Sequence, residues 1–180
     1  IPAAKPVIDE SDIEAAVRVL RSGMVVQGPE VKAFVAEFAP LAGAQHCVAV
    51  NSGTSALHLS LLALGLGPGD EVICPSFSFA ATANAIRLVG ATPVFADIDR
   101  DTFNVDPAAV EALIGPKTAA IMPVHLYGLP ADMPALVALA EKHGLAIVED
   151  SAQAHAAAIN GRPVGAWGKS GCFSFYPTKN

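Results

Sequence analysis

The chain of 180 residues has the length of one ordinary domain, so a complete two-domain enzyme should not fit within it. Its composition is 52% hydrophobic and only 16% charged, which excludes disorder and predicts a large buried core. The formal net charge of −6 argues against general nucleic-acid binding, because clustered Lys and Arg are needed to bind a phosphate backbone.

The first predicted element is a helix over Glu10–Ser22, with Ser11 as the expected N-cap and Gly23 as the expected stop. Residues 1–10 contain neither the basic nor the apolar region of a signal peptide. The three cysteines are odd in number and far apart, which favours neither a disulfide framework nor a metal motif, so a reducing cytoplasm is expected. They are Cys47, Cys74 and Cys172.

Six short apolar runs follow this helix, rich in Val and Ile and mostly without apolar–polar alternation. Such runs are typical of strands that are covered on both faces in a parallel sheet. The runs are Cys47–Val50, Glu71–Pro75, Thr92–Ile98, Thr118–Val124, Ala146–Asp150 and Gly171–Phe175. Helical segments separate most of them, at Thr54–Leu64, Ala80–Val89, Pro107–Ile114 and Ala131–His143. The pattern predicts an α/β fold with a mostly parallel, doubly wound sheet and helices on both faces.

The uncharged stretch between Glu37 and Asp70 is predicted to be interior, because polar residues and glycines interrupt it too often for a membrane helix. Neither a membrane nor nucleic acid is therefore an expected partner, which leaves small molecules and other protein chains. In doubly wound sheets small ligands bind outside the carboxyl ends of the strands. Candidate functional residues are therefore those just after each apolar run.

The segment Asn51–Leu57 follows the first predicted strand and opens a helix. Free N–H groups and the positive end of the helix dipole at such a point form an anion site. A simpler interpretation, that Ser52 or Thr54 only caps the helix, is supported equally well by the local pattern.

Asp150 ends the fifth predicted strand and so lies at the carboxyl-end edge of a mostly apolar sheet. An ionised carboxylate is costly there unless it meets a cation, and a protonated ring nitrogen would be such a partner. A turn carboxylate bonded to a nearby N–H group is the alternative. Glu149, its neighbour, should point to the opposite face of the sheet.

Lys179 follows the sixth predicted strand. A lysine near an apolar pocket is shifted toward its amine form, which attacks carbonyls to make Schiff bases, although most lysines are solvated surface charges. Phe79 follows the second strand and could cover a planar ligand, although an aromatic there is more often part of the core.

Two other kinds of site receive little support. Pro163–Ser170 ends like a phosphate-binding loop, but Pro163 occupies the position of the required first Gly and no strand directly precedes it. The five histidines show no ligand pair at helical spacing with a third ligand nearby, so no metal is expected.

A phosphate site, a carboxylate, a lysine and an aromatic at one sheet edge together describe a site for pyridoxal phosphate, PLP. The phosphate would be held by N–H and hydroxyl donors, and the carboxylate would keep the pyridine nitrogen protonated. The lysine would hold the aldehyde carbon as an imine.

The sequence resembles the DegT/DnrJ/StrS family of sugar aminotransferases, which have the fold-type I architecture of aspartate aminotransferase. The resemblance covers essentially the whole chain. It rests on the segments VAVNSGTSALHLSL, EVICPSFSFAATANAI, PVFADID, PVHLYGLPADM, VEDSAQAHAA and GCFSFYPTKN. Ser151 and Ala156 stand where the family more often has Ala and Gly, and Lys169 where an acidic residue is frequent.

This resemblance implies a role for each candidate residue. Lys179 would form the Schiff base and Asp150 would pair with the pyridine nitrogen. The remaining implied cofactor contacts are Gly53, Thr54 and Ser174 at the phosphate, Phe79 on the ring face and Gln153 beside the phenolic oxygen.

The implied activity is transfer of an amino group from glutamate to a nucleotide-linked keto-sugar, by a homodimer with PLP as cofactor. Related sugar dehydratases have histidine in place of the Schiff-base lysine, so Lys179 favours transamination. The alternatives are a keto-inositol aminotransferase, another fold-type I enzyme, or a non-catalytic PLP-binding or regulatory relative.

Two parts are expected in the chain: an N-terminal helix and substrate-side segment over residues 1–26, and a PLP-binding large domain over residues 27–180. Family members continue past this point into another strand of the sheet and a C-terminal small domain. That strand would lie between the first and sixth strands, so the chain is expected to be a truncated large domain with unpaired edges. It would be poorly stable and inactive alone.

Overall fold

The computed structural model describes residues 6–179. Residues 1–5, which belong to the segment that lacks signal-peptide features, lie outside the described residues. So does Asn180, the last residue of the second predicted part.

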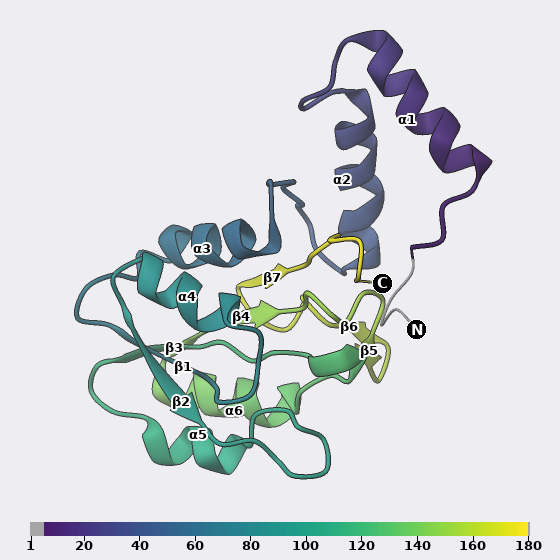
Figure 1. Ribbon diagram of the computed structural model, residues 1–180. Helices are drawn as coiled ribbons and strands as arrows, with labels where there is room; N and C mark the ends of the chain where they lie inside the picture. The colour runs from purple at the N-terminus through teal and green to yellow at the C-terminus, as the bar shows by residue number, and fades with distance from the viewer. Residues whose placement is uncertain (1–5, 180) are drawn as a thin grey trace.

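A five-stranded parallel sheet in the order β2-β1-β3-β4-β7 forms the centre of the molecule (Figure 1). The strands are β1 (Glu71–Pro75), β2 (Thr92–Ala96), β3 (Thr118–Ile121), β4 (Ala146–Asp150) and β7 (Ser170–Cys172). Because all five run in the same direction, their carboxyl ends meet at one edge of the sheet. The predicted α/β fold with a parallel sheet is confirmed.

Helices cover both faces of this sheet (Figure 1). They are α3 (Gly53–Ala63) and α4 (Ala81–Leu88) on one face, and α5 (Pro107–Leu113) and α6 (Met133–His143) on the other. Successive side chains of a strand point to opposite faces of the sheet. In β1, Val72 and Cys74 pack against α3 and α4, whereas Ile73 packs against α5 and α6. This two-sided burial explains why the strands read as continuous apolar runs.

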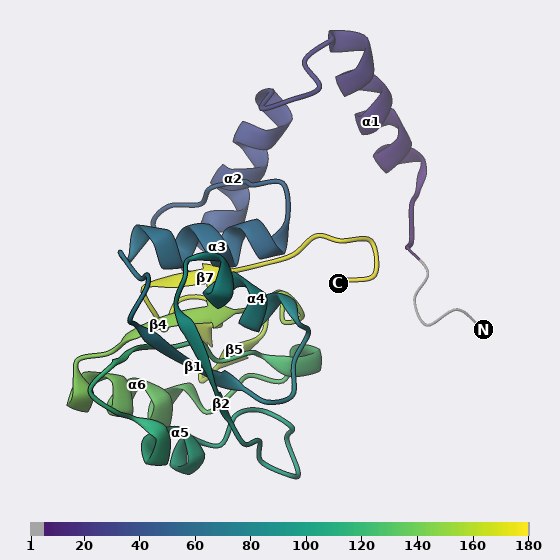
Figure 2. The ribbon, with the colours of Figure 1, turned by 60° about the vertical axis from the view of Figure 1, so that its left-hand side comes forward.

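Two N-terminal helices, α1 (Glu10–Ser22) and α2 (Pro29–Leu41), extend away from the sheet (Figure 2). No residue of α1 is buried, and an ion pair of 3.0 Å between Arg18 and Glu30 joins it to α2. The predicted bounds of the first helix are confirmed, but its N-cap is Asp9 instead of Ser11. The Asp9 carboxylate accepts two backbone N–H groups and Asp12 bonds back, a reciprocal arrangement that Ser11 could not make from inside the helix.

The prediction of a strand over Cys47–Val50 is wrong, because these residues do not form one. No described strand pairs with them, and the Val48 side chain is 81% exposed. Since a strand exists only through hydrogen bonds to a neighbour, apolar composition alone does not make one. The last predicted strand is likewise shorter than expected and ends at Cys172, where its pairing with Asp150 ends.

Three smaller elements complete the chain. A one-turn 3-10 helix, η1 (Leu126–Gly128), precedes α6. Strands β5 (Ala158–Ile159) and β6 (Arg162–Pro163) form a hairpin whose turn, Asn160–Gly161, has positive φ at both positions, as a type I′ turn requires. Within residues 6–179 we find no helix that is both long enough and apolar enough to cross a bilayer.

Candidate functional site

The N-terminus of α3 presents free N–H donors next to the sheet edge. The Ser52 hydroxyl caps this helix by accepting the N–H of Ser55 at 3.1 Å. The N–H groups of Gly53 and Thr54 precede the first donors that can bond within the helix, so capping by Ser52 leaves both for a ligand. The Ser52 cap is therefore confirmed, and it is compatible with the prediction that the Gly53 and Thr54 N–H groups bind an anion.

Ser174, which follows β7, lies directly against Gly53. A Cβ atom placed on Gly53 would be 3.0 Å from Ser174 Cβ and 3.4 Å from its hydroxyl oxygen. A glycine at this position thus allows a close approach that any side chain would obstruct. The structure brings Gly53, Thr54 and Ser174 together, so that a hydroxyl and two N–H groups share one small cradle.

Asp150 ends β4 and is only 5% exposed. One carboxylate oxygen accepts the hydroxyl of Thr82 at 2.8 Å, and the other accepts the N–H of Ala152 at 3.2 Å. Burial raises the pKa of this carboxyl, and the charge of Lys179 partly opposes the shift. No ion pair to Asp150 occurs among residues 6–179, so this site favours the arrival of a cationic partner.

Lys179 lies within electrostatic reach of Asp150. Its positive charge lowers the pKa of both the Asp150 carboxyl and the His155 imidazole, although burial is the main reason that the His155 pKa is lowered. The Lys179 backbone N–H donates to the Tyr176 carbonyl at 2.7 Å, which closes a tight turn after β7. Lys179 is therefore close enough to Asp150 for its charge to act on that carboxyl.

An aromatic cluster holds the segment that leads to Lys179. The Phe175 ring packs edge-on against the rings of Phe34, Phe38 and His155, at centroid distances of 4.9, 5.2 and 4.9 Å. Phe38 also contacts Phe173 at 5.0 Å. These contacts attach α2 to the end of β7, and no local pattern in the sequence indicates them.

The last two predicted contacts lie on loops beside Asp150. Phe79 follows β1, and its side chain is 71% exposed, so it is not part of the core and can cover a planar ligand. The Gln153 side-chain oxygen accepts the N–H of Tyr127 at 2.8 Å.

Glu149 points to the opposite face of the sheet from Asp150, as predicted. Its buried carboxylate accepts the N–H groups of Gly165, Trp167 and Gly168, each at 2.7 Å. It also bonds to His125 Nε2 at 3.0 Å, and His125 Nδ1 accepts the Ala131 N–H at 3.1 Å. The loop Pro163–Ser170 therefore supplies N–H groups to an internal carboxylate.

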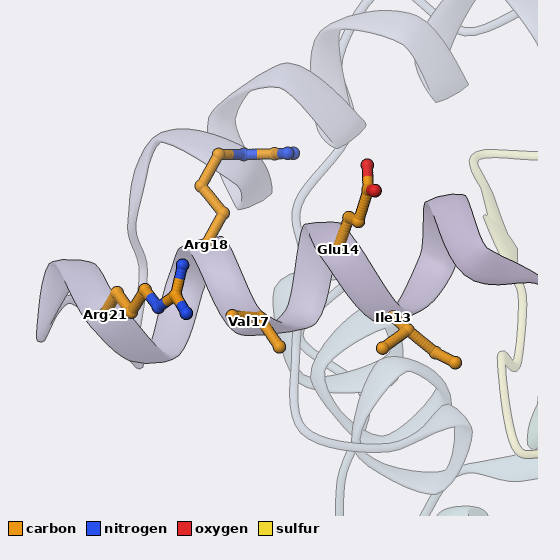
Figure 3. A pocket seen from close by; sticks show the side chains of 5 residues that line it. All are labelled: Ile13, Glu14, Val17, Arg18 and Arg21. Atoms are coloured by element: carbon orange, nitrogen blue, oxygen red, sulfur yellow. The ribbon is translucent and has the colours of Figure 1, made fainter.

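Elsewhere the described residues show no comparable site. Among them no group of three or more His, Cys, Asp or Glu side chains is arranged to hold a metal ion. A shallow surface pocket on α1 lies between charged and apolar side chains of that single helix, with none of the predicted site residues (Figure 3). It is lined by Ile13, Glu14, Val17, Arg18 and Arg21.

The donor set fits pyridoxal phosphate. N–H and hydroxyl donors suit a phosphate, and a buried carboxylate that forms no ion pair suits a protonated ring nitrogen. An amine within reach of that carboxylate suits an aldehyde. Ser78 and Thr82, which support Asp150, are functional candidates that the sequence did not indicate.

A family model described as the DegT/DnrJ/EryC1/StrS aminotransferase family matches residues 6–180. Over 163 residues the chain is 55% identical to UDP-N-acetyl-3-dehydro-alpha-D-glucosamine 3-aminotransferase of Acidithiobacillus ferrooxidans, covering 91% of this chain and 44% of the relative.

Solved structures show the same similarity. DesV of S. venezuelae, solved in complex with a ketimine intermediate, has a TM-score of 0.89 and 53% identity, covering 94% of this chain and 46% of that one. The PLP form of Spr1654 from Streptococcus pneumoniae has a TM-score of 0.95 and 36% identity, covering 99% and 50%. The chain thus spans about half the length of the proteins that it matches.

Proposed function

Because the chain belongs to the DegT/DnrJ/EryC1/StrS aminotransferase family, we propose that the protein transfers an amino group from glutamate to a nucleotide-linked keto-sugar, with PLP as cofactor. One observation carries the proposal: Asp150, a buried carboxylate that forms no ion pair among the described residues, lies within electrostatic reach of Lys179, at the sheet edge where the Gly53–Thr54 donors open a helix. The nucleotide-sugar 3-aminotransferase of A. ferrooxidans supports the substrate class.

Each residue has a physical task in this proposal. The N–H groups of Gly53 and Thr54 and the Ser174 hydroxyl bind the phosphate. Asp150 holds a proton at the ring nitrogen, because a buried carboxylate is stabilised by an adjacent positive charge. The remaining two contacts are Phe79, which covers the ring face and excludes water, and Gln153, which lies beside the phenolic oxygen.

Lys179 carries out two steps. When bound, PLP supplies an aldehyde that forms imines with amines and a ring that accepts electrons. Lys179 Nζ would hold the cofactor at its aldehyde carbon until an amino donor takes the place of the lysine. The released amine would act as the base that takes the proton from the α-carbon of the donor and as the acid that delivers a proton to the former aldehyde carbon.

The proposal is tested by following the cofactor absorption of the PLP-loaded protein at its natural length. Glutamate alone should bleach the absorption band, and a nucleotide-linked keto-sugar should restore it with release of the amino sugar. Restoration by a keto-inositol but by no keto-sugar would favour the alternative substrate class. Absence of bleaching with every amino donor would contradict the proposal, and Lys179→Arg is the control that should not bleach.

A homodimer is part of the proposal, on the strength of the family resemblance. Light scattering on the protein at its natural length should give twice the monomer mass. A monomeric mass together with full activity would contradict it.

A further inference from the structure

Two hydroxyl groups form a hydrogen-bonded chain that ends at the Asp150 carboxylate. The Thr82 hydroxyl oxygen is 2.8 Å from one oxygen of Asp150, and the Ser78 hydroxyl oxygen is 2.9 Å from that of Thr82. Thr82 lies in the first turn of α4 and is 1% exposed. This hydrogen-bonded chain therefore connects the loop after β1, through α4, to the end of β4.

The direction of donation follows from the chemistry of the groups. An ionised carboxylate only accepts hydrogen bonds, so the Thr82 hydroxyl hydrogen points to Asp150. That leaves the Thr82 oxygen as the acceptor for the Ser78 hydroxyl. The Ala152 N–H bonds to the second carboxylate oxygen, so both oxygens are fixed and each still has a lone pair for a ligand.

We propose that Thr82 is a positioning residue, which holds the Asp150 carboxylate toward the ring nitrogen of the cofactor, and that Ser78 orients Thr82. This inference rests on the proposed function. Ser78 directly precedes Phe79. The same hydrogen bonds therefore connect Asp150, which would pair with the ring nitrogen, to the loop whose Phe79 would cover the ring. A hydrogen bond to a charged group in a water-poor site constrains its direction more strongly than a contact in water does.

The test compares the affinity of the apoprotein, at its natural length, for PLP and for deaza-pyridoxal phosphate, in which a carbon replaces the ring nitrogen. The wild-type protein should prefer PLP, since only PLP offers a proton to Asp150. Thr82→Val removes the hydroxyl and keeps the branched shape, and it should reduce this preference roughly tenfold, the loss expected for one hydrogen bond to a charged group. Thr82→Ser retains the hydroxyl and should keep the preference.

Two further variants complete the experiment. Thr118→Val is the matched control, because the Thr118 hydroxyl accepts one N–H, from Gly115 at 2.9 Å, at the opposite end of the sheet, and the preference should not change. Ser78→Ala leaves Thr82 in place and should reduce the preference in the same direction. If Thr82→Val does not fold, the Ser78→Ala variant alone tests the positioning role.

The outcomes are distinguishable. A wild-type protein that binds neither compound contradicts the proposed function itself, and one that binds both equally contradicts the role of Asp150. A wild-type preference that persists unchanged in Thr82→Val, or in Ser78→Ala if that variant alone folds, overturns the positioning role. An equal loss in Thr82→Ser and Thr82→Val would also overturn it, because shape and not the hydroxyl would then be responsible.

Discussion

Among single residues, Asp150 is a buried carboxyl whose pKa is raised by its surroundings. Burial disfavours its charged form, and the hydrogen bonds from Thr82 and Ala152 compensate only partly, so its pKa stays above the ordinary value. Proteins tolerate such a group where a ligand completes it. In the apoprotein the carboxyl should therefore lower stability, and a cationic ring should relieve the cost.

Asp150→Asn should change the pH dependence of stability in the apoprotein. The folded state keeps the Asp150 proton to a higher pH than the unfolded state, so the free energy of unfolding falls as pH rises above the ordinary carboxyl pKa toward the raised one. Asparagine does not titrate, and the variant should lose this fall and gain stability relative to wild type as pH increases. Urea unfolding at a series of pH values measures the difference.

Asp99→Asn is the control of opposite sign. Hydrogen bonds from Thr102 lower the pKa of the exposed Asp99 carboxyl, so its contribution is present above the ordinary pKa and is lost as pH falls. This variant should lose stability relative to wild type as pH rises. An unchanged pH slope in Asp150→Asn would contradict the placement of Asp150 in a desolvated site.

The three cysteines should differ in reactivity toward iodoacetamide. Burial raises the pKa of Cys74 to about 12 and that of Cys172 to about 11, and neither thiol is exposed. Cys47 is only half-buried, and we expect it to be labelled first, because a thiol reacts as an accessible thiolate. Peptide mass spectrometry of the native protein measures the order, and labelling of Cys74 at the rate of Cys47 would contradict the packing described above.

At the scale of elements, Glu149 connects β4 to the loop that leads into β7. Glu149→Gln would replace one acceptor oxygen with an NH₂ group that faces N–H donors. The expected loss in the free energy of unfolding is about 3 kcal/mol, as for other buried charges whose partners are left unsatisfied. Urea unfolding measures it.

Glu111→Gln provides a matched control for this prediction. Glu111 forms an exposed ion pair of 2.7 Å with Lys142, and the same chemical change there should have little effect. Equal effects of the two substitutions would show that the Glu149 contacts do not stabilise the fold.

The sequence predicts an element well when the features that form it lie within the segment itself, and poorly when they lie in a neighbouring strand. Strands β1 and β4 have the predicted bounds, because runs of Val and Ile that are buried on both faces are visible within the segment itself. The segment Cys47–Val50 looks the same in sequence but has no neighbour in the described chain, and composition cannot show that.

The site was predictable to the same extent. Asp150 ends an apolar strand, Lys179 follows another, and the segment containing Gly53 opens a helix, so their positions near the sheet edge follow from their order along the chain. Thr82 contacts Asp150 from 68 residues away, through a hydroxyl that resembles any other in the sequence. Such partners become visible only when the fold brings α4 against the sheet.

For the molecule as a whole, the open side of the sheet predicts a pattern of hydrogen exchange. In residues 1–180 alone, amides of Cys47–Val50 should exchange rapidly, whereas those of β1 should be protected by pairing on both sides. Because the family resemblance implies a further strand beside Cys47–Val50, we expect these amides to be protected in the protein at its natural length. Equal exchange of this segment in the two forms would contradict that arrangement.

The covalent attachment of the cofactor at Lys179 is the central claim, and borohydride reduction tests it most directly. Reduction of the PLP-loaded protein should leave a pyridoxyl group on the peptide that contains Lys179. Lys179→Arg should abolish the label, and Lys169→Arg, which changes an exposed lysine just before β7, should retain it. A label on any other lysine, or none in a protein that binds PLP, would contradict the assignment.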